Sequence, residues 1–422
     1  MELETKENKF LFFLFLIIPI SLIVGSSISL INIILIELGF IYYFYLNKNS
    51  FFIKKNTIYL LFLIQIYLVF NSFISINYEI GLSRNLGFFR FIILFVFINF
   101  LFHKNYNLSK LLHFWAFIIL LLILDIYVEF YSGSNVFGWG KIEIDGIKQP
   151  NGKRIMSFFK DEPIAGAYVS AFILLISGFL LNYYKKKRYI PLLFILFAFL
   201  AILLTGERSN TIKSLIGILF LFISLDFLKL RTKVISLITF FILVFLILSQ
   251  STYLKMRYYG QFLHNFSSVE RYEKFLDQSL YFQLYKSGFE VFKNYPIFGV
   301  GNKNYRVETC KSVIDQRKYG YKCLTHPHQI YIELLSEHGL FGSIIILGIF
   351  FTLIFKIIKN VLLSRNYLQI GSLIFVVLTF IPILPGGSFF GDFNSNLFWL
   401  NFSIMFACCE RTNIFTDIKR NN

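Results

Sequence analysis

Residues 325–342 hold the densest group of side chains that could carry chemistry. His326 and His328 flank Pro327, just ahead of a long apolar run. Proline is favoured at the first position of a helix, so we expect a helix to start there with His328 in its first turn. A histidine in this place can act as a general base near neutral pH. The residues also leave open a capping or interfacial histidine, or a metal site that pairs His326 with His328.

Two glycines follow at spacings that place them on the same helical face as His328. Gly339 and Gly342 stand 11 and 14 residues further along the chain, which returns close to the same side of a helix. Small residues of this kind let another helix approach closely. We therefore expect this helix to be pressed into a bundle while its start presents the imidazole to the aqueous side.

Arginines form the second group of candidates. Arg208 lies in a short polar stretch, residues 205–210, between two strongly apolar runs. An arginine at a membrane boundary is costly unless it is paired or bound to an anion, and its planar fork of donors suits phosphate. An ion pair with Glu207 that stabilises the turn is the alternative. Arg90 falls inside the apolar run 88–102 and is a further functional candidate, although snorkelling could accommodate it.

The elements that must position these residues are membrane helices. The chain is 56% hydrophobic with a mean hydropathy of +0.64, and its apolar runs are long enough to cross a hydrocarbon layer about 30 Å thick. We predict an all-α polytopic bundle of about twelve spans and one large, partly helical loop. The expected spans are residues 10–25, 28–46, 58–75, 86–102, 111–131, 163–182, 189–205, 211–228, 233–250, 339–358, 367–385 and 393–409.

Loop charges predict the topology. Lys and Arg gather in alternate short loops, which marks those loops and both termini as cytoplasmic. Most of the net charge of +17 is therefore a topology signal, and no nucleic-acid motif accompanies it. The expected organisation is one integrated domain: spans in 1–250, a large periplasmic loop at 251–335, and spans with a cytoplasmic tail in 336–422.

The loop at 251–335 has features of its own. It holds twelve Lys and Arg against seven Asp and Glu, which fits either an anionic ligand or a solvated basic surface near anionic lipid. We expect a short amphipathic helix over 283–293, a Pro-Gly turn over 295–301, and a disordered or clamped excursion over 311–322. An oxidising periplasm would allow a disulfide between Cys310 and Cys323, with two free thiols as the alternative.

Four motifs together resemble a known family. His328-Gln329, nine residues, then Gly339-x-x-Gly342 is similar to a signature of the O-antigen ligase and polymerase superfamily. Arg208 resembles that family's outward arginine before the eighth span. The 295–301 turn is similar to its Pro-x-x-Gly-x-Gly turn, and Gly387-Ser-Phe-Phe390 resembles the end of its eleventh helix. The related region is about 195–355, and the resemblance in order and topology covers most of the chain.

The resemblance implies a metal-independent, inverting glycosyltransferase without a cofactor, in the bacterial inner membrane with its active site on the periplasmic face. The donor would be a glycan on undecaprenyl pyrophosphate. A ligase would pass it to the lipid A core, and a polymerase to another glycan chain. His328 would be the base and Arg208 would hold the pyrophosphate. Expected further contacts to pyrophosphate or glycan come from Arg90, Lys286, Arg306 and His326.

One position departs from the family pattern. Many members carry a second loop arginine four residues before an aromatic residue, but here the residue four before Tyr285 is Tyr281. Lys286, Arg271, Arg257 or Arg306 could supply the missing charge. A function of another class, a lipid-linked sugar flippase or transporter, would favour charged or broken helices near the midplane in repeated halves. No internal repeat is visible, and most charges lie at the span edges.

Overall fold

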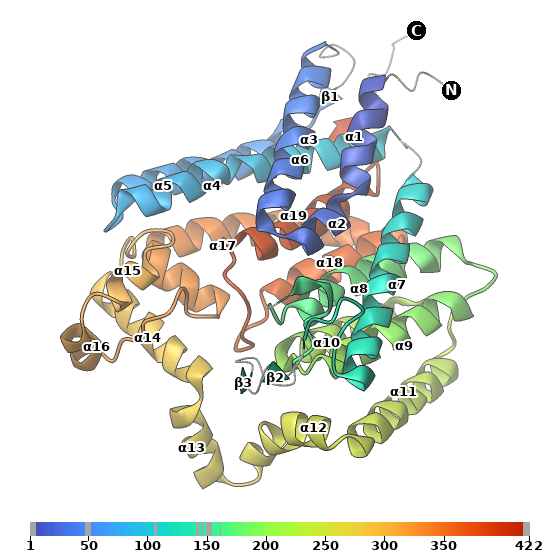
Figure 1. The fold of residues 1–422 in the computed structure, drawn as a ribbon. Helices are drawn as coiled ribbons and strands as arrows, with labels where there is room; N and C mark the ends of the chain where they lie inside the picture. Colours follow the sequence, from blue (N-terminus) through green and yellow to red (C-terminus); the bar gives the residue numbers. More distant parts are fainter. Residues whose placement is uncertain are drawn as a thin grey trace. The chain divides into compact units, whose positions relative to one another are not determined.

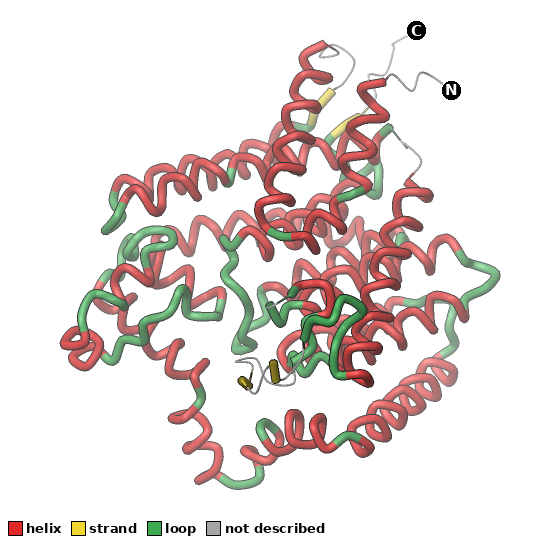
Figure 2. The backbone as a smooth tube through the Cα atoms, in the orientation of Figure 1, coloured by secondary structure: helices red, strands yellow, loops and turns green. Residues whose placement is uncertain are grey.

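The computed structural model describes residues 6–46, 52–104, 108–140, 143–144, 147–148, 154–160 and 162–416. Figure 2 shows that helices make up most of this chain. The predicted all-α class is therefore confirmed. The chain divides into two compact units, each assembled from three separate segments. The first is Met1–Ile36, Asn105–Ser268 and Ser364–Thr379, and the second is Glu37–Lys104, Val269–Leu363 and Phe380–Asn422.

The first unit is centred on α8, which is buried along most of its length and packs against α9, α10 and α18. Gly178 of α8 and Gly371 of α18 lie at the contact between these two helices, each against the other helix's backbone. The α-helices of this unit (Figure 1), with α3 continuing into the second unit, are α1 (Lys6–Leu16), α2 (Ile18–Val24), α3 (Ser26–Leu46), α7 (Leu108–Ser132), α8 (Ala165–Tyr183), α9 (Tyr189–Leu204), α10 (Arg208–Ser224), α11 (Leu230–Gln250), α12 (Thr252–Leu254) and α18 (Tyr367–Thr379). Its short elements are the 3-10 helices Ser157–Phe159 and Leu263–Phe266, the π-helix Lys255–Gly260, and the paired strands β2 (Glu143–Ile144) and β3 (Ile147–Lys148).

The second unit packs α6 against α19 through aromatic rings. Phe91 stacks on Trp399 with ring centroids 5.8 Å apart, and Phe95 meets Phe406 edge to face. Much of the phenylalanine in this part of the sequence therefore serves packing. The elements of the unit are α4 (Lys55–Phe73), α5 (Tyr78–Gly87), α6 (Phe89–His103), α13 (Val269–Gln278), α14 (Leu280–Asn294), α15 (Tyr305–Thr309), α16 (Val313–Tyr319), α17 (Ile330–Ser364), α19 (Asp392–Ala407) and the paired strands β1 (Phe52–Ile53) and β4 (Phe415–Thr416).

Each expected span falls on a helix or on two consecutive helices. Within the described residues, seven helices or helix pairs are long and apolar enough to cross a membrane, so the count of about twelve stays a prediction. The seven are Ser26–Leu46, Lys55–Phe73, Tyr78–His103, Leu108–Ser132, Ala165–Tyr183, Leu230–Gln250 and Ile330–Ser364. The first expected span, 10–25, is interrupted after Leu16, and Pro19 lies at the start of α2.

The large loop is ordered at residues 311–322, which the sequence predicted to be either disordered or clamped. The helix predicted over 283–293 is α14, and the Pro-Gly turn follows it. The excursion 311–322 contains α16, which is capped by the Ser312 side chain and ends at Gly320 in the left-handed conformation. A disulfide joins Cys310 to Cys323 across it, so the expected pairing is confirmed. The excursion is clamped, not disordered.

Candidate functional site

His328 lies immediately before a helix, not inside its first turn. α17 begins at Ile330, and His328 has a positive φ of 57°. The reason is local: the Gln329 side chain accepts a hydrogen bond from the Ile332 amide at 2.9 Å, which satisfies a donor of the first turn. The prediction of a helix from Pro327 is therefore wrong by three residues.

The His328 imidazole is oriented by a distant glycine. Its Nδ1 lies 3.2 Å from the Gly386 carbonyl oxygen, and the Gly386 amide donates to the His328 carbonyl at 2.8 Å. A carbonyl can only accept, so Nδ1 carries the proton and Nε2 keeps its lone pair. Burial lowers the pKa of His328, although the Gly386 contact and the charge of Glu333 oppose part of that shift. The ring is thus a neutral imidazole at neutral pH, in the tautomer that a base requires.

Two further rings flank His328. The rings of His326 and His328 lie 3.9 Å apart, and Tyr281 meets His328 edge to face with centroids 5.7 Å apart. Tyr281 is the residue that stands where many relatives carry an arginine. Burial, with the charges of His328 and Lys303, lowers the pKa of His326 to about 3. Among the described residues the Nε2 atom of His326 is buried without a hydrogen-bond partner, and no group of three or more possible metal ligands gathers.

Lys303 is the cation of this site that sequence reasoning missed. Its ammonium group donates to the Ser388 hydroxyl and lies 3.9 Å from the Glu333 carboxylate. Glu333 is fully buried and also accepts from the Ser388 hydroxyl and, at 2.9 Å, from the Phe389 amide. The lysine is therefore neutralised and held in place close to the histidine pair. Its position directly after the Gly-x-Gly turn was the available signal.

Buried asparagines hold the turn that carries Lys303. The Asn302 amide donates to the Asn71 side chain at 2.8 Å, and the Asn302 side chain donates to Asn85 at 2.5 Å. On the other side, Asn304 accepts from the Asn77 amide at 2.9 Å. Lys303 itself has a φ of 62°, a conformation uncommon for a non-glycine residue. These bonds to α4 and to both ends of α5 hold the turn from which Lys303 extends.

Gly339 interrupts α17. Its φ of 61° and ψ of −167° are not helical, and a Cβ there would lie 2.3 Å from the Ile297 carbonyl oxygen. The amides of Leu340 and Phe341 instead donate to Pro296 and Ile297 at 2.8 and 3.0 Å. The break in α17 therefore docks onto the Pro-Gly turn, a close approach that only glycine permits.

The shared helical face predicted for His328 and the two glycines is consequently wrong. His328 precedes the helix, and Gly339 breaks it. Gly342 does face a helix, since a Cβ there would collide with the hydroxyl of Tyr67 on α4. The three residues of the motif therefore have different roles: His328 precedes the helix, Gly339 contacts the Pro-Gly turn, and Gly342 packs against α4.

Arg84 and Arg90 both pair with Asp392. The Arg90 side chain is only 13% exposed and its guanidinium lies 4.7 Å from the centre of the Phe91 ring. Asp392 follows Gly386 by six residues, which an extended chain spans in at most about 20 Å. The cost of a buried arginine is thus met inside the second unit by a carboxylate.

Lys286 and Arg306 are exposed. Lys286 pairs with Asp277 at 3.0 Å on the surface of α13 and α14, and Arg306 lies on α15. No recorded contact among the described residues links either of them to His328. Lys303 is the loop cation that the fold places by the histidines.

Arg208 belongs to the first unit, where it opens α10. Its guanidinium donates to the Gln261 carbonyl at 2.8 Å and lies 5.9 Å from the centre of the Phe262 ring. These contacts tie the start of α10 to the chain that follows α12.

Glu207, next to it, serves another helix. Its carboxylate accepts from the amides of Gly166 and Ala167 at 2.7 and 3.1 Å, at the start of α8, and from the Asn210 side chain. Burial raises the pKa of Glu207 to about 7, although these donors oppose the shift. Glu207 thus caps the start of α8. The sequence had offered a different role for it, an ion pair with Arg208.

The comparison with protein families agrees with the motifs. Residues 192–347 match the family described as O-antigen ligase, a segment that includes Arg208, the Pro-Gly turn, Lys303 and His328. Residues 192–347 are therefore a segment of the O-antigen ligase type. A search of the curated proteins finds no match. For this O-antigen ligase relative, the apolar helices and the family together indicate a membrane glycosyltransferase.

Proposed function

We propose that the protein transfers a glycan from undecaprenyl pyrophosphate to a sugar hydroxyl, with His328 as the general base. The observation that carries this is the contact between His328 Nδ1 and the Gly386 carbonyl, because it leaves Nε2 as a proton acceptor. The family match supplies the reaction class.

The reaction would be one inverting displacement. Nε2 of His328 takes the proton of the acceptor hydroxyl while its oxygen attacks the anomeric carbon of the donor sugar. The bond from that carbon to the pyrophosphate oxygen breaks, and the lipid pyrophosphate leaves with the bonding electrons. Fixed cations stabilise such a leaving group best in a site shielded from water, and we assign this role to Arg208.

The preferred acceptor is the lipid A core, as for a ligase. A polymerase of the same superfamily would use the end of another glycan chain, with identical chemistry at the base. The site would face the periplasm of the bacterial inner membrane, with both termini cytoplasmic. A flippase would move the same lipid-linked glycan without consuming an acceptor.

The test uses the full-length protein in proteoliposomes with an undecaprenyl-pyrophosphate-linked glycan, lipid A core and unextended glycan together. Transfer to lipid A core in the presence of a divalent-metal chelator is expected, and His328→Ala should abolish it. Transfer to the glycan chain would assign a polymerase. Translocation without transfer, or transfer that is unchanged in His328→Ala, would contradict the proposal.

A further inference from the structure

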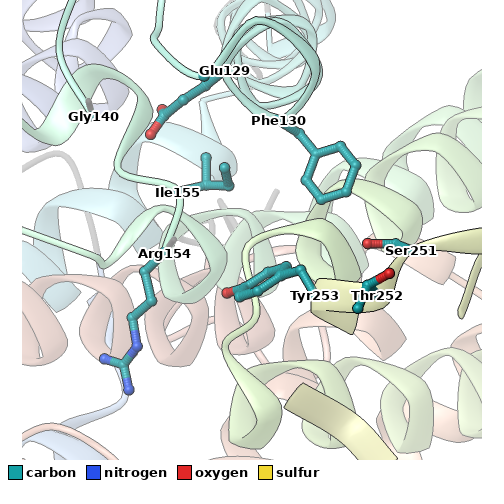
Figure 3. A pocket seen from close by; sticks show the side chains of 9 residues that line it. Glu129, Phe130, Gly140, Arg154, Ile155, Ser251, Thr252 and Tyr253 are labelled. Carbon is teal, nitrogen blue, oxygen red and sulfur yellow. The ribbon is translucent and has the colours of Figure 1, made fainter. Parts of the chain in front are cut away.

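A cavity of about 320 Å³ in the first unit has no role in the mechanism above. It lies between the end of α7, the segment that begins at Arg154, and the junction of α11 with α12 (Figure 3). Its side chains are the carboxylate of Glu129, the rings of Phe130 and Tyr253, the guanidinium of Arg154, and the hydroxyls of Ser251 and Thr252. The volume is in the range of small-molecule sites.

Two buried carboxylates fix the wall that carries Arg154. Glu129 accepts from the amides of Met156 and Ser157 at 3.0 and 2.5 Å. Asp125, one turn earlier on α7, accepts from the Ser157 hydroxyl at 2.5 Å. The chain directly after Arg154 is thus anchored to α7. These hydrogen bonds hold the backbone next to Arg154 in place at the cavity.

Two polar groups at the cavity can donate hydrogen bonds to a ligand. Within the described part of the chain, the charge of Arg154 acts on the Glu207 carboxylate without a hydrogen bond between them, and the buried hydroxyl of Tyr253 has no hydrogen-bond partner. The Tyr253 hydroxyl packs against the backbone of Gly206, and burial raises its pKa, so it remains a donor. Unsatisfied buried donors such as the Tyr253 hydroxyl are rare in proteins. A ligand with oxygen acceptors would satisfy this hydroxyl and could also accept from the half-buried Arg154 guanidinium.

We propose that this cavity binds an acidic sugar of the glycan substrate through its carboxylate, an inference that rests on the proposed glycan transfer. The planar fork of Arg154 matches a carboxylate with two parallel hydrogen bonds. The hydroxyls of Ser251 and Thr252 can bond sugar hydroxyls, and the rings of Phe130 and Tyr253 offer apolar faces to a sugar ring.

The charge of the lining favours a monoanion over a pyrophosphate. The side chains that line the cavity include one cation, Arg154, and one carboxylate, Glu129. Among the lining side chains, a pyrophosphate would set several negative charges against the single guanidinium of Arg154. A sugar carboxylate needs one guanidinium.

The test compares trigalacturonic acid with its trimethyl ester, which has the same sugars without the charge. Binding is measured by calorimetry on the full-length protein in detergent. The acid is expected to bind about tenfold or more tighter, as for a charged hydrogen-bonded pair. Arg154→Gln should remove this preference, and Tyr253→Phe should weaken the acid a few-fold, while Arg231→Gln, an exposed cation on α11, should leave it unchanged.

Tyr253→Phe and a thermal melt keep the test decisive if Arg154→Gln folds poorly. The inference would be overturned by equal binding of acid and ester, or by an acid preference that survives in a folded Arg154→Gln. Displacement of the acid by inorganic pyrophosphate that depends on Arg154 would overturn it as well. His328→Ala separates the two proposals, because it should lose transfer but keep acid binding. If the wild-type protein binds the acid but shows no glycan transfer, the proposed function is refuted and the binding inference is not.

Discussion

The polar groups around His328 and those around Arg154 are treated differently by the fold. Near His328 the charges compensate one another, with Lys303 set against Glu333. The groups left for a substrate are imidazole nitrogens. In the first unit, Arg154 lines a cavity and acts on the Glu207 carboxylate through its charge without a hydrogen bond, and the nearby Glu129 is occupied by backbone amides.

The difference separates proton transfer from anion binding. A base works best as a neutral, oriented ring in a rigid surround, which the Gly386 contact and the compensated charges provide. A binding site for an anion instead needs donors that are not already used.

The largest effect is expected for His328→Ala. Loss of the base should lower the rate of transfer about 10²–10⁴-fold, with donor binding little changed. The measurement is single-turnover transfer in proteoliposomes. His326→Ala is the control, since its ring has no assigned proton transfer, and an equal loss in that variant would show that the two rings act as one unit.

Next is Arg208, for which Arg208→Ala should slow transfer about 10²-fold if its guanidinium stabilises a leaving pyrophosphate. Arg208→Lys keeps the charge but loses the planar fork, so it should recover only part of the rate. Steady-state rates with each variant test this. Full recovery in the lysine variant would mean that charge alone matters, and an unchanged alanine variant would remove Arg208 from the reaction.

The pH dependence should show a smaller effect. Burial lowers the pKa of His328, so the base is already neutral at pH 7, and transfer should fall only as pH drops through a value below the usual 6.5. Glu333 raises the pKa of His328, so Glu333→Gln should move this acid limb to still lower pH. The profile of kcat/KM measures it. A limb above the ordinary histidine value would contradict the assignment.

The disulfide should matter least for transfer and most for stability. Cys310→Ser or Cys323→Ser opens a loop with a sequence separation of 13 residues, and the closed-loop entropy is worth about 3 kcal/mol. The free energy of unfolding should fall by about that amount in denaturant titrations, with transfer nearly intact. Cys409→Ser, at a described cysteine outside the disulfide, is the matched control. No loss of stability would mean that α16 is held by other contacts.

By itself, the sequence determined the elements and the motifs. Apolar runs long enough to span a membrane identify helices because that signal is local to each segment. Helix α14 and the Cys310–Cys323 pair were predictable for similar reasons of local pattern and compartment. The order of the motifs likewise led to the family that the match over residues 192–347 supports.

Only the tertiary structure decided how the side chains are used. The partner that orients His328 is Gly386, 58 residues away, and the carboxylate that neutralises Arg90 is Asp392, 302 residues away. No sequence motif marked Arg154. Its cavity exists because the end of α7 and the start of α12 meet the segment that carries Arg154. Hydrogen-bond partners and burial follow from which segments the fold brings together, and spacing along a chain does not encode that. The sequence thus identified His328 as the candidate base, and the fold determined which of its ring nitrogens carries the proton.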